Sequence, residues 1–144
     1  MGGTTEYVLM AVFLLLSAFF SGSETALVSM TKLRIRQAIE RHGSRGEALS
    51  EWLNHSDRLL TTILVGNNIA NIAGTSIAAL LVSRVIGDPE TAVWVNTIIM
   101  TSLILVLSEI FPKQIAKRRP EMFAIRVIRP LSVVSFTLMP IVWF

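Results

Sequence analysis

The chain has 144 residues, of which 52% are hydrophobic and only 16% are charged, and its mean hydropathy is +0.61. Soluble domains carry about 25% charged residues, so neither a lone globular enzyme nor an acidic disordered tail fits this composition. A net charge of +3 is too small to indicate a nucleic-acid partner, and none is expected. The absence of cysteine excludes disulfides, zinc–thiolate sites, iron–sulfur clusters and cysteine nucleophiles.

Three long apolar runs predict three transmembrane helices. Tyr7 to Met30 contains one charged residue, Leu59 to Ser83 contains none, and Thr91 to Pro112 contains one. Each run exceeds the roughly 20 residues that a helix needs to cross the hydrocarbon core of a bilayer. The first run is expected to be a retained span, because no basic segment precedes it as in a cleavable signal peptide.

A fourth run, Phe123 to Phe144, is interrupted by two arginines and two prolines: Arg126, Arg129, Pro130 and Pro140. Proline removes a backbone donor and bends a helix, and arginine makes a full crossing costly. The run therefore predicts a kinked amphipathic helix that lies partly in the membrane interface. The chain ends within this run at Trp143-Phe144, which we expect to be a boundary inside a longer protein.

The basic residues predict the topology. All but one of the 13 lie in two places, between the first and second spans or after the third: Lys32, Arg34, Arg36, Arg41, Arg45, Arg58, Lys113, Lys117, Arg118, Arg119, Arg126 and Arg129. The exception is Arg84, in the short second connection. By the positive-inside rule, the first and third connections are cytoplasmic and the N-terminus is outside.

The connections themselves are predicted to be partly helical. Residues 31–57 are too polar to span and are typical of two short helices, at roughly 32–42 and 45–55, with Trp52 resting against the membrane surface. Asp88 followed by Pro89 is typical of a helix start, with aspartate as the cap and proline in the first turn.

Polar side chains inside the apolar runs mark a candidate site. Depth can be counted along each helix from the nearest inner basic residue at about 1.5 Å per residue. Ser21 lies roughly 16 Å from Lys32, Asn67 lies roughly 14 Å from Arg58, and Glu109 lies roughly 6 Å from Lys113. Asn71 follows Asn67 by one turn and shares its helix face. Three helices are thus predicted to place oxygen-bearing side chains in the inner half of the membrane.

Backbone features near these residues suggest additional oxygens. Ser21 and Ser23 point to different sides of a regular helix, and both would face one point only if the backbone loosens at Gly22. Pro112 lacks an N–H, so the carbonyl of Ser108 loses its helical donor. Such backbone is tolerated at membrane depth where it lines a polar cavity.

The donor set predicts the ligand. It offers carboxylate, amide, hydroxyl and carbonyl oxygens, whereas His42 and His55 lie outside the spans. All-oxygen ligation favours hard cations such as Mg²⁺ or Ca²⁺ over zinc or copper. The spans contain no Ser–His or paired-Asp arrangement, so an enzyme is not expected.

Simpler interpretations stay open for several of these residues. Small polar side chains commonly hydrogen-bond across helix interfaces, which would account for Asn68, Thr75, Ser76 and Ser102. Glu109 could pair with Lys113 four residues later. Glu24 could be a ligand, a protonated acid or an interface-facing acid, and Lys117-Arg118-Arg119 could simply set topology and contact lipid headgroups.

Three sequence blocks resemble the transmembrane domain of the CorC/CNNM family, most closely bacterial CorC proteins, over essentially the whole chain. The blocks are Phe20-Ser21-Gly22-Ser23-Glu24-Thr25-Ala26, Leu64-Val65-Gly66-Asn67-Asn68-Ile69-Ala70-Asn71 and Glu109-Ile110-Phe111-Pro112-Lys113. The resemblance implies that residues 1–144 are one CorC/CNNM-type transmembrane domain with a cytoplasmic helical pair at 31–57 and a juxtamembrane belt helix at 119–144. The expected fold class is an all-α membrane protein.

The resemblance also implies a function and partners. The expected activity is Mg²⁺ export by alternating access, with Na⁺ as a candidate coupling ion, and no other cofactor. The implied Mg²⁺ ligands are Ser21, Ser23, Asn67, Asn71 and Glu109. The implied setting is a homodimer in the bacterial inner membrane, contacting lipid and continuing into cytosolic CBS domains that are absent from this chain. The alternative is a Mg²⁺-sensing or structural membrane anchor for a cytosolic regulatory domain.

Overall fold

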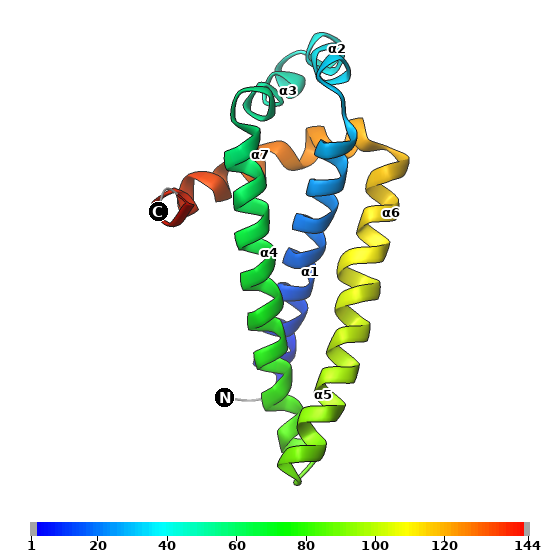
Figure 1. The fold of residues 1–144 in the computed structure, drawn as a ribbon, viewed down its shortest axis with the longest axis vertical. Coiled ribbons are helices and arrows are strands. Elements are labelled where there is room, and N and C mark those ends of the chain that lie inside the picture. The colour runs from blue at the N-terminus through cyan, green and yellow to red at the C-terminus, as the bar shows by residue number, and fades with distance from the viewer. Residues whose placement is uncertain (1–2, 143–144) are drawn as a thin grey trace.

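Three long helical rods form the body of the protein. The structure is a computed structural model that describes residues 3–142, and it contains no strand within that range. The rods run side by side (Figure 1): α1 (Gly3–Ser29), α4 (Ser50–Val85), and a third built from α5 (Pro89–Leu103), η1 (Ile104–Ile110) and α6 (Phe111–Arg118). All three are long and apolar enough to cross a membrane, which confirms the predicted all-α membrane fold with three spans.

The remaining helices gather at one end of the rods. There α2 (Lys32–His42) and α3 (Ser44–Glu47) cap the bundle, and α7 (Pro120–Val142) crosses it (Figure 1). We call this the α2 end, and the opposite end, at the connection from α4 to α5, the α5 end. The two basic connections that were predicted to share one side of the membrane do lie together at the α2 end. The boundary predicted at Trp143-Phe144 lies outside the described residues.

The predicted helix over 32–42 matches α2, which begins after Thr31, whose hydroxyl accepts a hydrogen bond from the Arg34 N–H at 3.2 Å. Gly43 turns the chain with φ +60°, a conformation that glycine adopts without steric cost. The predicted helix over 45–55 ends where expected but is divided: α3 is one turn, helix resumes at Ser50, and the non-helical backbone of His55 separates this start of α4 from the second span.

The reason for that difference is burial. Trp52, expected at the membrane surface, is 8% exposed and belongs to the hydrophobic core. This core lies at the α2 end, where α1, α2, α4, α6 and α7 meet, and its fully buried members include Leu27, Leu49 and Ile128. Docking Trp52 against these residues turns the start of α4 inward instead of laying it along the bilayer.

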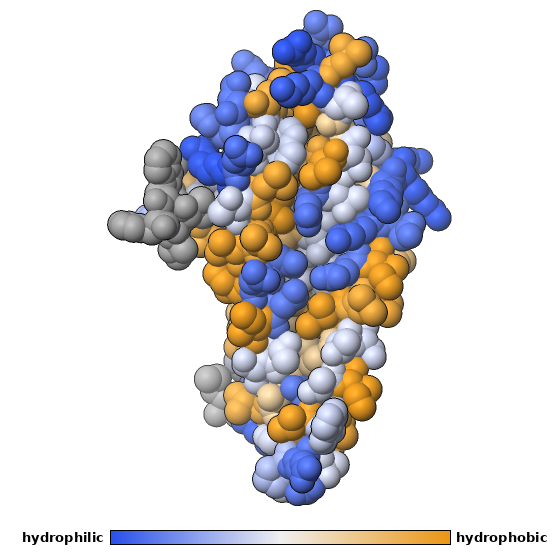
Figure 2. All heavy atoms as spheres, viewed as in Figure 1, coloured by the Kyte–Doolittle hydropathy of each residue, from blue (hydrophilic) through white to orange (hydrophobic). Residues whose placement is uncertain are grey.

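Away from this core, the rods expose large apolar side chains. Leu15, Ile72 and Ile98 are each more than 60% exposed. Figure 2 shows hydrophilic residues concentrated at the two ends and hydrophobic residues along the rods, interrupted on this face by a hydrophilic patch midway along α4. Apolar sides of this kind are matched by lipid, while the helices satisfy their own backbone groups.

The third rod changes from α-helix to π-helix just before Pro112. η1 is a π-helix, and the Phe111 N–H bonds to the carbonyl of Val106, five residues earlier. Pro112, which follows, cannot donate a hydrogen bond to the turn before it. The loosened backbone expected near Pro112 therefore takes the form of a wider helical turn, a form that often occurs at functional sites.

Candidate functional site

A hydroxyl of α1 meets two side-chain amides of α4. Ser17 Oγ lies 2.8 Å from Asn67 Oδ1 and 2.6 Å from Asn71 Oδ1. Ser17 is fully buried, and both asparagines are half-buried. The one-turn spacing of the asparagines directs both amides at the same point on α1, as predicted from their shared face.

Glycines of α4 allow this close approach. A Cβ on Gly66 would lie 2.5 Å from Phe20 Cζ, and a Cβ on Gly74 would lie 3.4 Å from Phe13 Cβ. Gly66 and Gly74 lie two turns apart and flank the two asparagines along α4. The phenyl ring of Phe20 therefore fills the space of a side chain at Gly66 and holds the two helices close, whereas Gly74 only makes an ordinary van der Waals approach to Phe13.

The hydroxyl of this cluster faces more acceptor oxygens than it has protons to donate. A serine hydroxyl carries one proton, so Ser17 can satisfy one of the two amide oxygens at a time. The other oxygen then faces the Ser17 oxygen at short range without a donor. A cation or a rotated amide would remove that repulsion, and a buried set of converging oxygens is the arrangement that a hard cation prefers.

The serines of the first block are buried, but the backbone around them is regular. Ser21 lies one turn after Ser17 on α1 and is 2% exposed. Ser23 is also buried and donates its proton to the Phe19 carbonyl at 2.6 Å, which leaves its oxygen lone pairs available. The loosening at Gly22 that both serines would need to face one point does not occur: α1 continues as a helix, and a Cβ on Gly22 would lie 2.6 Å from Phe123 Cζ. Gly22 thus serves the packing of α7 onto α1.

The third rod contributes two neighbouring side chains that face different ways. Ser108 is buried, and its hydroxyl donates to the Leu14 carbonyl of α1 at 3.0 Å. Glu109 is half-buried and lines a cavity of about 290 Å³ between α4 and the third rod. The same cavity is lined by the threonines Thr75, Thr97 and Thr101, so it combines one carboxylate with three hydroxyls.

The predicted site residues therefore fall into two adjoining groups. Asn67 and Asn71 meet at Ser17, whereas Glu109 lies in the threonine-lined cavity. Thr75 follows Asn71 by one turn on α4 and links the two groups. Among the hydrogen bonds of residues 3–142, none joins Glu109 or Ser21 to either asparagine.

Ser17 is a residue of this cluster that the sequence did not predict. A single serine in an otherwise apolar run is typical of helix packing, and only its spacing four residues before Ser21 places it on the same face as the predicted site.

Two of the simpler interpretations can be compared with the described contacts. The ion pairs formed among residues 3–142 do not include one between Glu109 and Lys113. Ser102 bonds to the carbonyl of Ile98 in its own helix instead of bridging helices. Glu24 is exposed on α1.

The donors are mainly neutral oxygens. Within the described part of the chain, no three His, Cys, Asp or Glu side chains are grouped as metal ligands. Any cation held here would be bound by one carboxylate together with amide and hydroxyl oxygens, an uncommon set for zinc and an acceptable one for Mg²⁺.

The fold and these intramembrane polar groups define the class: a multi-pass α-helical membrane domain with a polar cluster between its spans. The chain belongs to the CNNM family, because residues 8–144 match the family model for the cyclin M transmembrane N-terminal domain.

Relatives of known sequence are longer than this chain. A UPF0053 protein of Haemophilus influenzae is 35% identical over 143 residues, which is 97% of this chain and 33% of the relative. The UPF0053 inner membrane protein YfjD of Escherichia coli strain K12 is 32% identical over 128 residues, 89% of this chain and 29% of the relative. The polyamine export protein of H. influenzae is 28% identical over 142 residues, 91% of this chain and 33% of the relative. The chain thus spans about a third of the length of these relatives.

Proposed function

We propose that this chain is the membrane domain of a Mg²⁺ transporter. The proposed ligands are the oxygens of Ser21, Ser23, Asn67, Asn71 and Glu109, with Ser17 as a neighbour that holds the two amides in place. The observation that supports the proposal is the convergence of two amide oxygens on one buried hydroxyl, which supplies one proton for two acceptors.

The ligand set suits a cation that has to be released from the site as well as bound there. Mg²⁺ accepts hard oxygen ligands at about 2.0–2.1 Å in octahedral geometry. With Glu109 as the single carboxylate, the site would keep an uncompensated positive charge on the bound ion. Such a site binds weakly enough for release, which conduction and transport require.

Movement of Glu109 would complete the site. In this conformation Glu109 lines the threonine cavity beside α4, while its neighbour Ser108 bonds to α1. Returning η1 from π-helical to α-helical pitch would shift the register by one residue and turn Glu109 about the axis on the order of 100°. We propose that this change accompanies alternating access, with ion binding favouring one of the two conformations.

The setting of this activity is part of the proposal. The positive-inside rule puts the α2 end in the cytosol and the N-terminus outside. The chain would export Mg²⁺ as a homodimer in the bacterial inner membrane, with Na⁺ as the coupling ion to test. Cytosolic CBS domains would regulate the longer parent protein.

Calorimetric titration of the purified chain with Mg²⁺ tests the site. Asn67→Ala and Glu109→Gln are expected to abolish the binding heat while the protein stays folded. Asn68→Ala is the matched control, since Asn68 has the same side chain on the same helix but is exposed. Unchanged affinity in both site variants would contradict the proposed site.

A polyamine is the second candidate substrate. The cavity beside Glu109 is also lined by Met100, Ile104 and Leu105, and apolar walls with one carboxylate suit an alkyl chain that ends in an ammonium. One relative is named a polyamine export protein. Proteoliposomes loaded with either Mg²⁺ or spermidine separate the two, and release of spermidine without release of Mg²⁺ would replace the Mg²⁺ proposal.

The remaining alternative is a Mg²⁺-sensing or structural anchor. A sensor binds Mg²⁺ without moving it, so titration would show binding whereas liposomes would show no Mg²⁺ flux. Flux that requires Glu109 excludes a sensor, and binding without flux in liposomes that contain the longer parent protein favours it.

A further inference from the structure

A large cavity opens at the corner between α6 and α7, away from the proposed ion site. Its volume is about 730 Å³. Three arginines line it, Arg118, Arg119 and Arg126, together with an apolar floor that includes Ile115 and Phe123. It therefore has a cationic rim over a hydrophobic base.

The charge of this rim is not neutralised within the described chain. Arg118, Arg119 and Arg126 are exposed, and none is among the arginines that form ion pairs there. The acid between them in sequence, Glu121, is instead engaged by Arg41 at 3.1 Å and by His42 at 3.5 Å. Three guanidinium groups are thus available for an anionic ligand.

The apolar floor continues into a second cavity along the rods. This groove has a volume of about 590 Å³ and shares Ile115 and Phe123 with the arginine cavity. Its other walls, which include Leu15 and Phe111, are apolar and run along α1 and the third rod. A ligand that fills both cavities must have an anionic head and a hydrocarbon tail.

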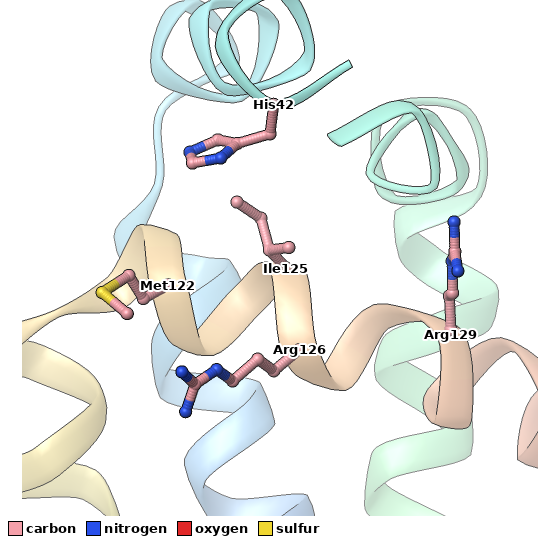
Figure 3. A pocket seen from close by; sticks show the side chains of 5 residues that line it. All are labelled: His42, Met122, Ile125, Arg126 and Arg129. Atoms are coloured by element: carbon pink, nitrogen blue, oxygen red, sulfur yellow. The ribbon is translucent and has the colours of Figure 1, made fainter. Parts of the chain in front are cut away.

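The position matches the membrane interface. Arg118 is the last residue of the third span, and α7 crosses the ends of the rods at this level (Figure 1). Figure 3 shows the Arg126 side chain extending below α7, whereas Arg129 points up, where its guanidinium donates to the Ser44 carbonyl at 3.2 Å; both also line a separate cavity beside His42. The Arg126 guanidinium therefore lies beneath α7, where the phosphate of a lipid headgroup would sit and where the planar fork of arginine can bind it in bidentate fashion.

We infer that this corner is a binding site for a phospholipid of net negative headgroup charge. The phosphate binds Arg118, Arg119 and Arg126, and an acyl chain lies in the groove below, against Phe123. Basic pockets beside membrane helices are suited to anionic headgroups. The lipid site does not depend on which cation the domain transports.

Native mass spectrometry of the full chain tests this site, with phosphatidylglycerol and phosphatidylcholine of identical acyl chains as probes. The chain should retain phosphatidylglycerol in preference to phosphatidylcholine. Arg126→Gln should weaken phosphatidylglycerol binding about tenfold, the effect of losing one charge-assisted contact. Arg129→Gln is the matched control, because it removes the same charge from the same helix, but Arg129 does not line the 730 Å³ cavity and bonds to the Ser44 carbonyl. It should leave binding unchanged.

Further measurements distinguish the possible ligands and check that each variant is folded. Inorganic phosphate and the soluble headgroup glycerophosphoglycerol should compete poorly, since they lack the tail; competition equal to that of the lipid would make this a free-phosphate site and overturn the inference. Equal losses of phosphatidylglycerol binding in Arg126→Gln and Arg129→Gln would also overturn the inference, because they would indicate general electrostatic attraction and no defined site. Arg126→Lys, which keeps the charge without the fork, should bind between wild type and Arg126→Gln, and unchanged thermal melting establishes that each variant is folded.

Discussion

Removing the Ser17 hydroxyl tests how much the hydrogen bond between α1 and α4 stabilises the protein. Ser17 Oγ lies within 2.8 Å of two amide oxygens, but it has one proton, so Ser17→Ala removes one hydrogen bond and not two. A hydrogen bond between membrane helices is worth about 0.6 kcal/mol on average and about 1.7 at most. Because Ser17 is fully buried and both contacts are short, we expect a coupling energy near the upper figure.

The assay is a double-mutant cycle in reversible unfolding from mixed micelles. Ser17→Ala and the paired change Asn67→Ala with Asn71→Ala, which leaves no amide oxygen to accept the Ser17 proton, should show a coupling of about 1 to 1.5 kcal/mol when combined. The control cycle replaces Ser17→Ala with Ser102→Ala, whose hydroxyl bonds within its own helix, and it should be additive to within about 0.5 kcal/mol. Equal coupling energies in the two cycles would refute the interaction.

Three other perturbations have defined outcomes. Gly66→Ala places a Cβ 2.5 Å from the ring of Phe20, so it should lower the free energy of unfolding by about 1–3 kcal/mol, and wild-type stability would contradict the close approach. Arg84→Gln should destabilise the protein more than Glu6→Gln, because Glu6 is the buried partner of their 2.6 Å ion pair and would be left uncompensated; unfolding of both variants checks the order. Hydrogen bonds at the start of α5, the largest from Thr91, hold the pKa of Asp88 below its ordinary value. The cap should therefore stabilise the protein above the unfolded carboxyl pKa of about 4 and lose that contribution as pH falls through the lower folded pKa, so the melting difference from Asp88→Ala should vanish in acid.

The sequence predicted the three spans because composition alone determines them. The apolar runs from Leu59 and Thr91 each lie within a membrane-length helix, and the run from Tyr7 ends one residue beyond the first such helix. The helices extend beyond the runs because helical backbone continues into polar residues at the membrane surface, as at the start of α4. The cap at Asp88 was also predictable, since it depends on residues three positions apart.

The features that the sequence did not predict depend on contacts between distant residues. Trp52 is buried in a core to which α1, α2 and α7 also contribute, and its own neighbours in sequence do not reveal that core. The role of Gly22 is set by Phe123 of α7. Of the candidate site, the shared face of Asn67 and Asn71 was predictable from spacing, whereas their meeting with Ser17 requires the packing of α1 on α4.

The position of a bound ion tests the central proposal most directly. Crystals of the chain grown with Mn²⁺ in place of Mg²⁺ would reveal the ion by its anomalous scattering. The proposal predicts one peak between α1 and α4, within ligand distance of the Asn67 and Asn71 side-chain oxygens, with the Glu109 carboxylate turned toward it. A peak only at surface carboxylates, or none near these asparagines at a Mn²⁺ concentration that saturates binding in solution, would contradict it.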